Sequence, residues 1–354
     1  MQRISNLHRA HKNKKDEFYT QLQDIEDELK YYQNEFFGKT ILCNCDDPKT
    51  SNFFKYFRAN FTKFGLKRLI STCYKDQRRK LFTPYCSQEK VMYSDITNPD
   101  KVSMNFLKGN GDFRSSECIE FLKESDIIIT NPPFSLFREF IKLLVKYDKK
   151  FIILGNINAI TYKEVFKLIK ENKLAVGVHF NQPMTFTSPY NQSKDNAYIT
   201  VPSICWFQNL QLSKKEVDFT TKYSDRNFQK YDNYDAINID KVKDIPFDYN
   251  GLMGVPITFL KYYNSNQFEI VGLLAPDSFG LSGIPATKNY NTFREIRQDG
   301  LFTKATGSKI NGNPILEGKP KKGVYYINEE TKQCVYSTYA RILIKKISKN
   351  SLDS

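Results

Sequence analysis

The sequence predicts an α/β fold, in which a mostly parallel, two-sided sheet is followed by a smaller C-terminal region. Short apolar runs alternate with stretches of helical periodicity through about residue 210. One run, at 127–130, is continuous and β-branched, which is typical of a strand buried on both faces. After residue 212 the chain becomes polar and tyrosine-rich. We therefore predict one domain at 1–212 and a second at 213–354.

The first helix is predicted within residues 15–37, where apolar side chains recur at helical spacing, and Gly38 ends it. A short apolar strand is predicted next, at 39–44. Pro48 and Ser51 then provide the start of a second helix. The buried face of that helix is predicted to consist of Phe53, Phe54, Phe57 and Phe61.

The loop after the 39–44 strand lies at a carboxyl end, where open α/β sheets bind ligands. It lacks the glycine-rich fingerprint of dinucleotide-binding folds and contains Asp46 and Asp47 instead. A carboxylate here could hold the ammonium group of a methionine moiety, although acids in a loop are most often simply solvated. The next strand, predicted at 66–72, ends without the acid that binds ribose hydroxyls in such folds.

A turn-rich link follows at 107–117, where Gly109 and Gly111 permit unusual backbone angles. Asp112 and Phe113 lie in this link. An acid beside an aromatic ring can accept a hydrogen bond from an adenine and stack on it, so both residues are candidates for binding an adenine ring.

The segment 131–134 (NPPF) follows the buried strand and precedes a stretch of helical periodicity. The Asn131 side-chain oxygen and the Pro132 carbonyl could accept both hydrogens of a planar amino group and direct its lone pair at a methyl donor. Pro132 and Pro133 fix the backbone, so the carbonyl is preorganised. Phe134 offers a flat face on which an extruded base can stack. The alternative is a proline-terminated strand in which Asn131 only caps the next helix.

The remaining elements of the first domain are predicted from apolar runs. Strands are expected at 149–156, 174–180 and 203–210, with a helix at 161–171 between the first two. The last two strands are predicted to pair with each other. The segment 181–199 between them is interpreted as a long loop, and loops of that length are usually functional.

The second domain is predicted to contain strands at 254–263, 268–275 and 339–347, separated by glycine and asparagine turns. Residues 280–322 contain six glycines and several lysines and are interpreted as a basic surface loop. We interpret this domain as a recognition region whose charges bind phosphate and whose loops read bases. The alternative is a structural appendage that completes the core.

Composition limits the class of partner and the cell compartment. Lys and Arg number 53 against 39 Asp and Glu, a net charge of +14 that indicates a polyanion, unless codon bias from an AT-rich genome explains it. No apolar window is long enough to span a membrane. The seven scattered cysteines fit reduced thiols and a cytoplasmic location. Cys43 and Cys45 lack zinc-site spacing, so no metal is expected.

Four stretches together closely resemble the EcoRI-type adenine-specific DNA methyltransferases. They are residues 16–29 (DEFYTQLQDIEDEL), 38–57 (GKTILCNCDDPKTSNFFKYF), 111–117 (GDFRSSE) and 130–134 (TNPPF). Later stretches such as 234–249 are similar to the same family, so the resemblance covers nearly the whole chain. NPPF-type elbows also occur in RNA and glutamine methyltransferases, whereas the NCDDP loop is more specific.

The resemblance implies a Rossmann-like class I methyltransferase sheet of seven strands, with S-adenosylmethionine at the carboxyl ends of its first strands. It implies catalytic roles for Asn131, Pro132, Pro133 and Phe134. The cofactor-binding residues that it implies are Phe18, Tyr19, Thr20, Asn44, Cys45, Asp46, Asp47, Pro48, Asp112 and Phe113.

We therefore predict a site-specific DNA adenine-N6 methyltransferase that transfers a methyl group from S-adenosylmethionine to an adenine flipped out of duplex DNA. The expected partner is double-stranded DNA. The protein is expected to be a cytoplasmic monomer of prokaryotic or phage origin, with a cognate restriction endonuclease as a candidate partner. Two alternatives remain open: an RNA or protein-glutamine methyltransferase that uses the same elbow, and a catalytically degenerate DNA-binding module.

Overall fold

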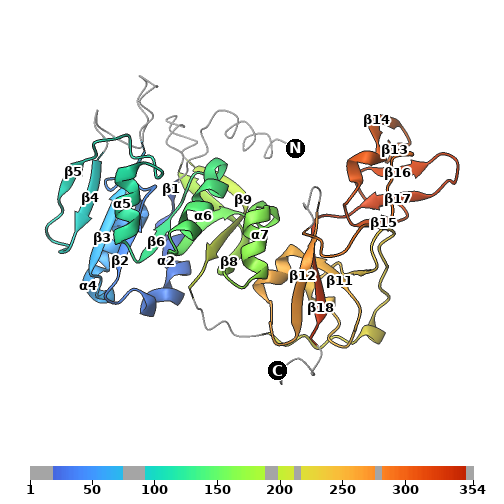
Figure 1. Ribbon diagram of the computed structural model, residues 1–354, viewed down its shortest axis with the longest axis horizontal. Coiled ribbons are helices and arrows are strands. Elements are labelled where there is room, and N and C mark those ends of the chain that lie inside the picture. The colour runs from blue at the N-terminus through green and yellow to red at the C-terminus, as the bar shows by residue number, and fades with distance from the viewer. Residues whose placement is uncertain (1–18, 75–91, 188–197, 211–216, 276–280, 348–354) are drawn as a thin grey trace. The chain divides into compact units, whose positions relative to one another are not determined.

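The computed structural model describes residues 19–74, 92–187, 198–210, 217–275 and 281–347 (Figure 1). The chain forms two compact units. Unit 1 consists of Met1–Ala159 and Lys173–Ser213, and unit 2 consists of Ile160–Asn172 and Lys214–Ser354. The segment that contains the predicted 161–171 helix is thus grouped with the C-terminal part of the chain.

The described residues of unit 1 form a nine-stranded sheet in the order β1-β8-β9-β7-β6-β2-β3-β4-β5. Only the four central strands, β3, β2, β6 and β7, run parallel to one another, and every flanking pair is antiparallel. The strands are β1 (Tyr19–Thr20), β2 (Thr40–Cys43), β3 (Arg68–Thr72), β4 (Met92–Ile96), β5 (Met104–Phe106), β6 (Ile127–Thr130), β7 (Lys150–Asn156), β8 (Ala175–Thr187) and β9 (Tyr198–Gln208).

The prediction of a mostly parallel sheet of seven strands is therefore wrong outside the centre of the sheet. A parallel pair needs a long crossover connection. Only seven residues, none of them helical, separate β4 from β5, and these two strands pair antiparallel. β4 and β5 were missed because their short, mixed sequences give no clear period. The central prediction holds, since all residues of β2 and β6 are buried, as a strand covered on both faces requires.

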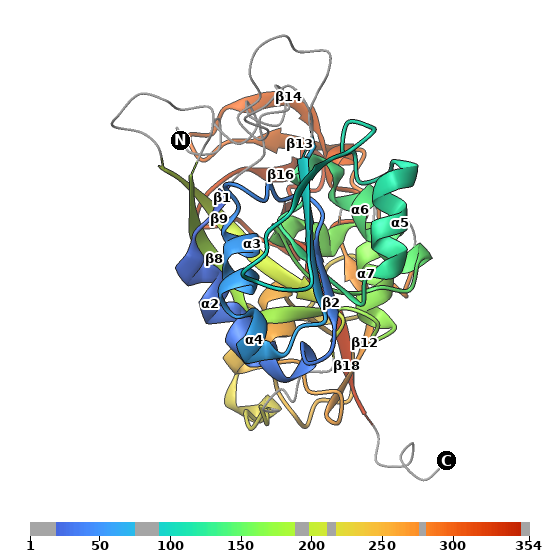
Figure 2. The same ribbon diagram turned by 90° about the vertical axis from the view of Figure 1, so that its left-hand side faces the viewer.

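Helices cover both faces of this sheet. Figure 2 shows α2 (Leu22–Leu29), α3 (Asn52–Ala59) and α4 (Phe61–Phe64) on one side, and α5 (Ser116–Glu124) and α6 (Phe137–Lys146) on the other. The four phenylalanines predicted for the buried face of the second helix are all buried, and Ser51 caps α3 through its hydroxyl. The predicted first helix starts later, at Leu22, because Tyr19 and Thr20 pair with β8 instead. α5 occupies part of the stretch predicted as a link.

The predicted pairing of the last two strands is confirmed, but the long loop between them is wrong. β8 continues to Thr187 and β9 begins at Tyr198, so both strands extend into the segment 181–199; residues 188–197 lie outside the described part. Met184, Phe186 and Val201 are buried in this extension. The alternation of buried and exposed residues is hard to see in the sequence. Polar residues such as Asn181 lie beside the apolar ones, and three register shifts interrupt the pairing of β8 with β9.

Unit 2 contains α7 (Lys163–Lys170) and two antiparallel-rich sheets, ordered β10-β11-β18-β12 and β14-β13-β16-β17-β15. Three strands of the five-stranded sheet lie within 280–322, so the interpretation of that segment as a surface loop is wrong. Its apolar residues form a small buried core with Tyr326 and Val335. The strands are β10 (Ile237–Asn238), β11 (Met253–Pro256), β12 (Phe268–Leu274), β13 (Phe293–Ile296), β14 (Phe302–Thr306), β15 (Ile315–Glu317), β16 (Tyr325–Asn328), β17 (Cys334–Ser337) and β18 (Arg341–Lys346).

The strands predicted at 268–275 and 339–347 are confirmed as β12 and β18. The strand predicted at 254–263 is only half correct, because β11 ends at Pro256 and a 3-10 helix follows at Ile257–Lys261. Proline lacks the N–H that would continue the ladder, which explains the break.

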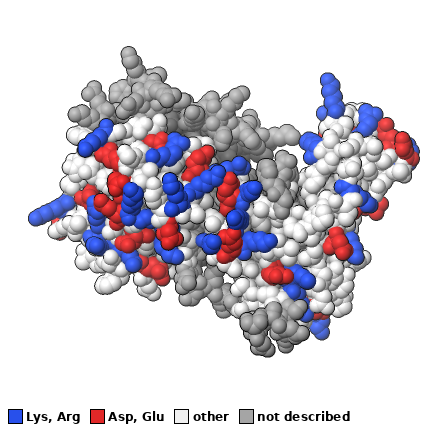
Figure 3. Space-filling model, in the orientation of Figure 1, with Lys and Arg blue, Asp and Glu red and all other residues white. Residues whose placement is uncertain are grey.

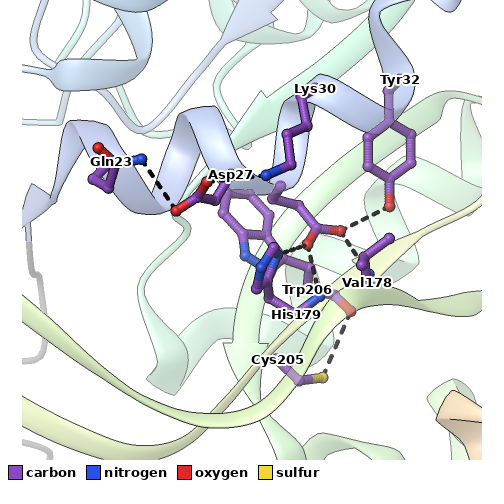
Figure 4. Close-up of polar contacts among 9 residues, drawn as sticks. Gln23, Asp27, Lys30, Tyr32, Val178, His179, Cys205 and Trp206 are labelled. Atoms are coloured by element: carbon purple, nitrogen blue, oxygen red, sulfur yellow. Dashed lines mark hydrogen bonds and ion pairs between the residues drawn. The ribbon is translucent and has the colours of Figure 1, made fainter.

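A buried carboxylate ties α2 to β8 in unit 1 (Figure 4). Glu28 is fully buried and accepts hydrogen bonds from the Tyr32 hydroxyl at 2.9 Å and from the backbone N–H groups of Val178 and His179 at 2.9 and 2.8 Å. The His179 ring also contacts it, with Nδ1 at 2.9 Å. A bulge in β8 frees these N–H groups, and Gly177 leaves room, since a Cβ there would lie 2.2 Å from a Glu28 oxygen.

We expect this pair to make stability pH-dependent. The hydrogen bond to Glu28 raises the pKa of His179 above its usual value. The ion pair then stabilises the fold fully below the ordinary histidine pKa, and its contribution is lost as pH rises through the raised value. The wild type should therefore be more stable than His179→Gln at pH 6, and the difference should shrink by pH 9. Urea unfolding of both proteins across this pH range measures the difference in their free energies of unfolding. A difference that does not change with pH would contradict the ion pair between His179 and Glu28.

Candidate active site at the carboxyl ends of the central strands

The predicted site segments meet where two parallel strands end side by side. β2 and β6 pair in register, with Ile41 opposite Ile127. Asn44 therefore begins the loop after one strand, and Asn131 begins the elbow after its neighbour. In open α/β sheets this edge is where ligands bind.

The elbow is rigid and anchored from within the unit. Pro132 is buried, whereas Asn131, Pro133 and Phe134 are half-buried. A 3-10 turn (Phe134–Leu136) follows, closed by the Leu136 N–H, which donates to the Pro133 carbonyl at 2.9 Å. Prolines at two successive positions leave this backbone few alternatives.

Asn131 does not act as a helix cap. The residue at the N-cap of α6 is Leu136, and no side chain caps that helix end. The Asn131 amide nitrogen instead donates to the Thr20 hydroxyl of β1 at 3.3 Å. The capping interpretation of this asparagine is therefore wrong, and the bond to Thr20 sets the orientation of its amide.

Asp46 joins the loop after β2 to the end of β6. Its carboxyl oxygens accept hydrogen bonds from the Ser51 hydroxyl at 2.7 Å and the Thr130 hydroxyl at 2.5 Å. Its backbone N–H donates to the Thr72 carbonyl of β3 at 2.8 Å. Burial raises the pKa of the Asp46 carboxyl to about 6, against the opposing effect of the two hydroxyl donors. The carboxyl is committed to the loop, and a contact with cofactor stays a prediction.

The residues next to Asp46 differ in whether their polar groups form hydrogen bonds. The Cys45 N–H donates to the Thr130 hydroxyl at 3.2 Å, and Asp47 accepts from the Lys49 N–H at 2.8 Å. Asn44 is only 2% exposed, and neither its amide nitrogen nor its oxygen has a hydrogen-bond partner among the described residues. A buried amide of this kind is costly unless something satisfies it. Pro48 is buried behind the loop.

The β1 strand lies against both segments. The Thr20 carbonyl accepts a hydrogen bond from the Asn52 side chain at 2.8 Å, and the Tyr19 hydroxyl accepts one from Thr50 at 3.3 Å. Together with the bond from Asn131, these contacts bring three sequence-predicted segments to one place. Phe18, the third residue predicted in this strand, lies outside the described residues.

Asp112 and Phe113 are engaged differently from the way predicted. The Asp112 carboxylate forms a bidentate ion pair with Arg114, at 2.9 and 2.7 Å, and these hydrogen bonds lower the pKa of Asp112. Phe113 is 4% exposed and packs edge-to-face on Phe140 of α6, with ring centroids 5.1 Å apart. Little of its ring is left as a stacking surface, so its adenine contact stays a prediction.

Sequence reasoning missed the hydroxyl partners of Asp46. Thr130 was assigned only to the strand, although a hydroxyl that ends an otherwise all-isoleucine run was a usable signal. Ser51 was assigned only as the helix cap, and its oxygen serves both purposes.

In the described ranges no three His, Cys, Asp or Glu side chains lie close enough together to hold a metal ion. Each helix described is too short or too polar to span a lipid bilayer.

Comparison with known proteins decides the family. A family model described as "Adenine-specific methyltransferase EcoRI" matches residues 6–347. The chain belongs to this family. It is an adenine-specific DNA methyltransferase, and the resemblance found in the sequence is confirmed. Adenine specificity removes glutamine as the acceptor.

Three curated relatives are similar over most of their length. Type II methyltransferase M.EcoRI of Escherichia coli is 48% identical over 75% of this chain and 88% of that protein. M.MgeORF184P of Mycoplasma genitalium is 40% identical over 77% and 87%, and M.MpnI of Mycoplasma pneumoniae is 38% identical over 76% and 86%. No solved structure matches the chain.

We expect Thr130→Val to destabilise unit 1 by about 1–3 kcal/mol, because it removes one hydroxyl donor from the buried Asp46 carboxyl and the acceptor of the Cys45 N–H. Thr72→Val is the matched control: Thr72 is equally buried at the end of β3, and its hydroxyl has no hydrogen-bond partner among the described residues. Denaturant unfolding of both variants measures the difference. Equal losses would mean that Asp46 is not the link described here.

Proposed function

We propose that the protein methylates N6 of adenine at a specific site in duplex DNA, with S-adenosylmethionine as the methyl donor and the target base flipped out of the helix. The observation that carries this proposal is the bridge from the loop after β2 to the elbow after β6 through Asp46 and Thr130. It keeps the cofactor loop and the NPPF elbow at one edge of the sheet, as methyl transfer between two ligands requires.

The elbow residues would bind and orient the adenine amino group. The Asn131 side-chain oxygen and the Pro132 carbonyl each accept one amine hydrogen, which draws the nitrogen lone pair out of conjugation and toward the methyl group. The bond from the Asn131 amide to Thr20 supports this orientation. Phe134 would stack on the flipped base. Such acceptors, fixed before reaction, need no rearrangement in the transition state.

The residues around the β2 loop fit a polar, zwitterionic ligand. Asn44 is a buried amide with unused donors and an acceptor among the described residues, and Tyr19 and Thr20 lie beside the same loop. We assign these residues to the amino-acid end of S-adenosylmethionine. That cofactor supplies an electrophilic methyl group on a sulfonium sulfur. Asp46 holds the loop in shape and acts as a positioning residue.

The partner assignments rest on charge and on the relatives. A net charge of +14 fits a polyanion, and we assign duplex DNA to unit 2 as a recognition region. The names of M.EcoRI and both mycoplasma proteins, which are Type II methyltransferases, support a restriction–modification role with a cognate endonuclease. We propose that the enzyme acts as a monomer, because each transfer modifies one strand.

The direct test is transfer of labelled methyl from S-adenosylmethionine to unmethylated DNA, total RNA and protein in parallel, followed by nucleoside analysis. We expect label only in N6-methyladenine from DNA, and long-read sequencing of that DNA then gives the site. Label in RNA alone would contradict DNA as the substrate. Binding of S-adenosylmethionine without any methyl transfer would favour a non-catalytic module.

We expect Asn131→Ala to lower the rate of methyl transfer by about 10²–10³-fold while DNA binding stays near wild type, because the variant removes an acceptor that acts on the reacting amine. Thr20→Val should lower the rate less, since it removes one contact that orients the Asn131 amide and leaves the Asn131 acceptor in place. Single-turnover assays and duplex binding measure both effects. Equal loss of binding and transfer in Asn131→Ala would contradict a catalytic role.

A further inference from the structure

The β13–β14 hairpin of unit 2 has a rigid tip. The Arg297 N–H donates to the Leu301 carbonyl, and the Gly300 N–H donates to the Arg297 carbonyl, both at 3.0 Å. Asp299 closes the turn by accepting from the Leu301 N–H at 3.0 Å. Gly300 has a φ of +85°, which few other residues adopt. β14 is also the last strand of its sheet, so one side of the hairpin is not paired with another described strand.

The side chains on this tip are exposed, and they include apolar and basic residues as well as Gln298 and Asp299. Leu301 is 61% exposed and Phe302 is 45% exposed. The Arg294 guanidinium lies over the Phe302 ring at 4.4 Å from its centroid and also pairs with Glu329 at 2.9 Å. Arg297 is exposed and forms no ion pair with any acid in the described part of the chain. A rigid backbone therefore presents an uncommitted arginine beside apolar surface.

The surrounding segment has a basic excess. Residues 294–322 contain seven Lys and Arg against three Asp and Glu. One of those acids, Glu295, is buried and engaged by Tyr326 at 2.6 Å and by Lys309 at 3.4 Å. Figure 3 shows basic side chains at the top of this part, with acidic side chains beside them. Three exposed lysines have no acidic partner within the described ranges: Lys304, Lys321 and Lys322.

We propose that this hairpin enters the major groove of duplex DNA, with Arg297 reading a base edge and Lys304, Lys321 and Lys322 binding phosphates. The inference rests on the proposed function of unit 2 and names the surface that performs it. The major groove is about 12 Å wide and admits a two-stranded ribbon. Arginine binds guanine through two parallel hydrogen bonds, so guanine is the base expected opposite Arg297. The three lysines supply positive charge for phosphate contacts, which position a protein on DNA without reading its sequence.

The phosphate contacts are tested with the full-length protein and a fluorescent duplex of scrambled sequence, which requires no methyl transfer. K304Q/K321Q/K322Q should lower affinity at least about tenfold and reduce the slope of log K against log salt by about 2–3. The matched control K39Q/K63Q/K67Q removes three exposed lysines near the amino ends of β2 and β3, the edge of the sheet opposite the site. It should change affinity by less than about threefold.

The base contact is tested on the duplex whose site the methylated DNA reveals, against the scrambled duplex. R297A should weaken binding to the site by about tenfold and binding to the scrambled duplex by less than about twofold. R297K keeps the charge but loses the planar fork, so it should show the same loss of discrimination with less loss of affinity. Circular dichroism confirms that each variant is folded.

Two results would overturn the proposal. Equal losses from the two lysine triples would mean that DNA responds only to net charge, and equal losses by R297A on both duplexes would mean that Arg297 reads no base. Failure of the proposed function is seen separately, as absence of methyl transfer to DNA in the wild type. In that case the scrambled-duplex comparison alone decides whether this hairpin binds DNA.

Discussion

The buried carboxyl of Asp46 is the interaction on which the architecture of the site depends. It lies between the loop after β2 and the end of β6, and hydroxyl groups from Ser51 and Thr130 hold it on both sides. Parallel pairing brings the two strand ends together, but it does not fix the loops that follow them. The buried Asp46 carboxyl fixes these loops, because the loss of any of its hydrogen-bond partners would leave an unsatisfied polar group in the core, which is costly. The loop and the elbow are thereby held in one arrangement.

The two central strands next to the proposed site were predicted better than the rest of the sheet, and the roles of the site residues stay predictions. The run 127–130 and the NPPF elbow have strong local signals, since β-branched residues favour a buried strand and proline must end it. The resemblance added the NCDDP loop and the assignment of Phe18, Tyr19 and Thr20 to cofactor binding, and it did not predict the strand at Tyr19–Thr20. What it could not supply was the bond network, because Thr130 and Asp46 are 84 residues apart and no local pattern reports their contact. Hence the two hydroxyl groups that bind the Asp46 carboxyl were not predicted, and its contact with cofactor stays a prediction.

The errors of prediction lie where tertiary pairing overrides local pattern. Residues 280–322 contain glycines and lysines that are typical of a surface loop, yet Phe293 and Ile315 bury on one face of a five-stranded sheet. The continuation of β8 is similar, because its register shifts break the period that a strand should show. In both places exposed polar residues stand beside the buried ones, so composition describes the solvent face and not the fold.

The account is tested most directly by a crystal structure of the protein with a non-reactive S-adenosylmethionine analogue and a duplex that contains its site. We predict one adenine outside the helix, with its amino group within hydrogen-bond distance of the Asn131 side-chain oxygen and the Pro132 carbonyl, and the bond between Asp46 and Thr130 intact. An adenine bound away from the elbow, or an Asp46 carboxyl turned out of the loop to the analogue, would contradict it.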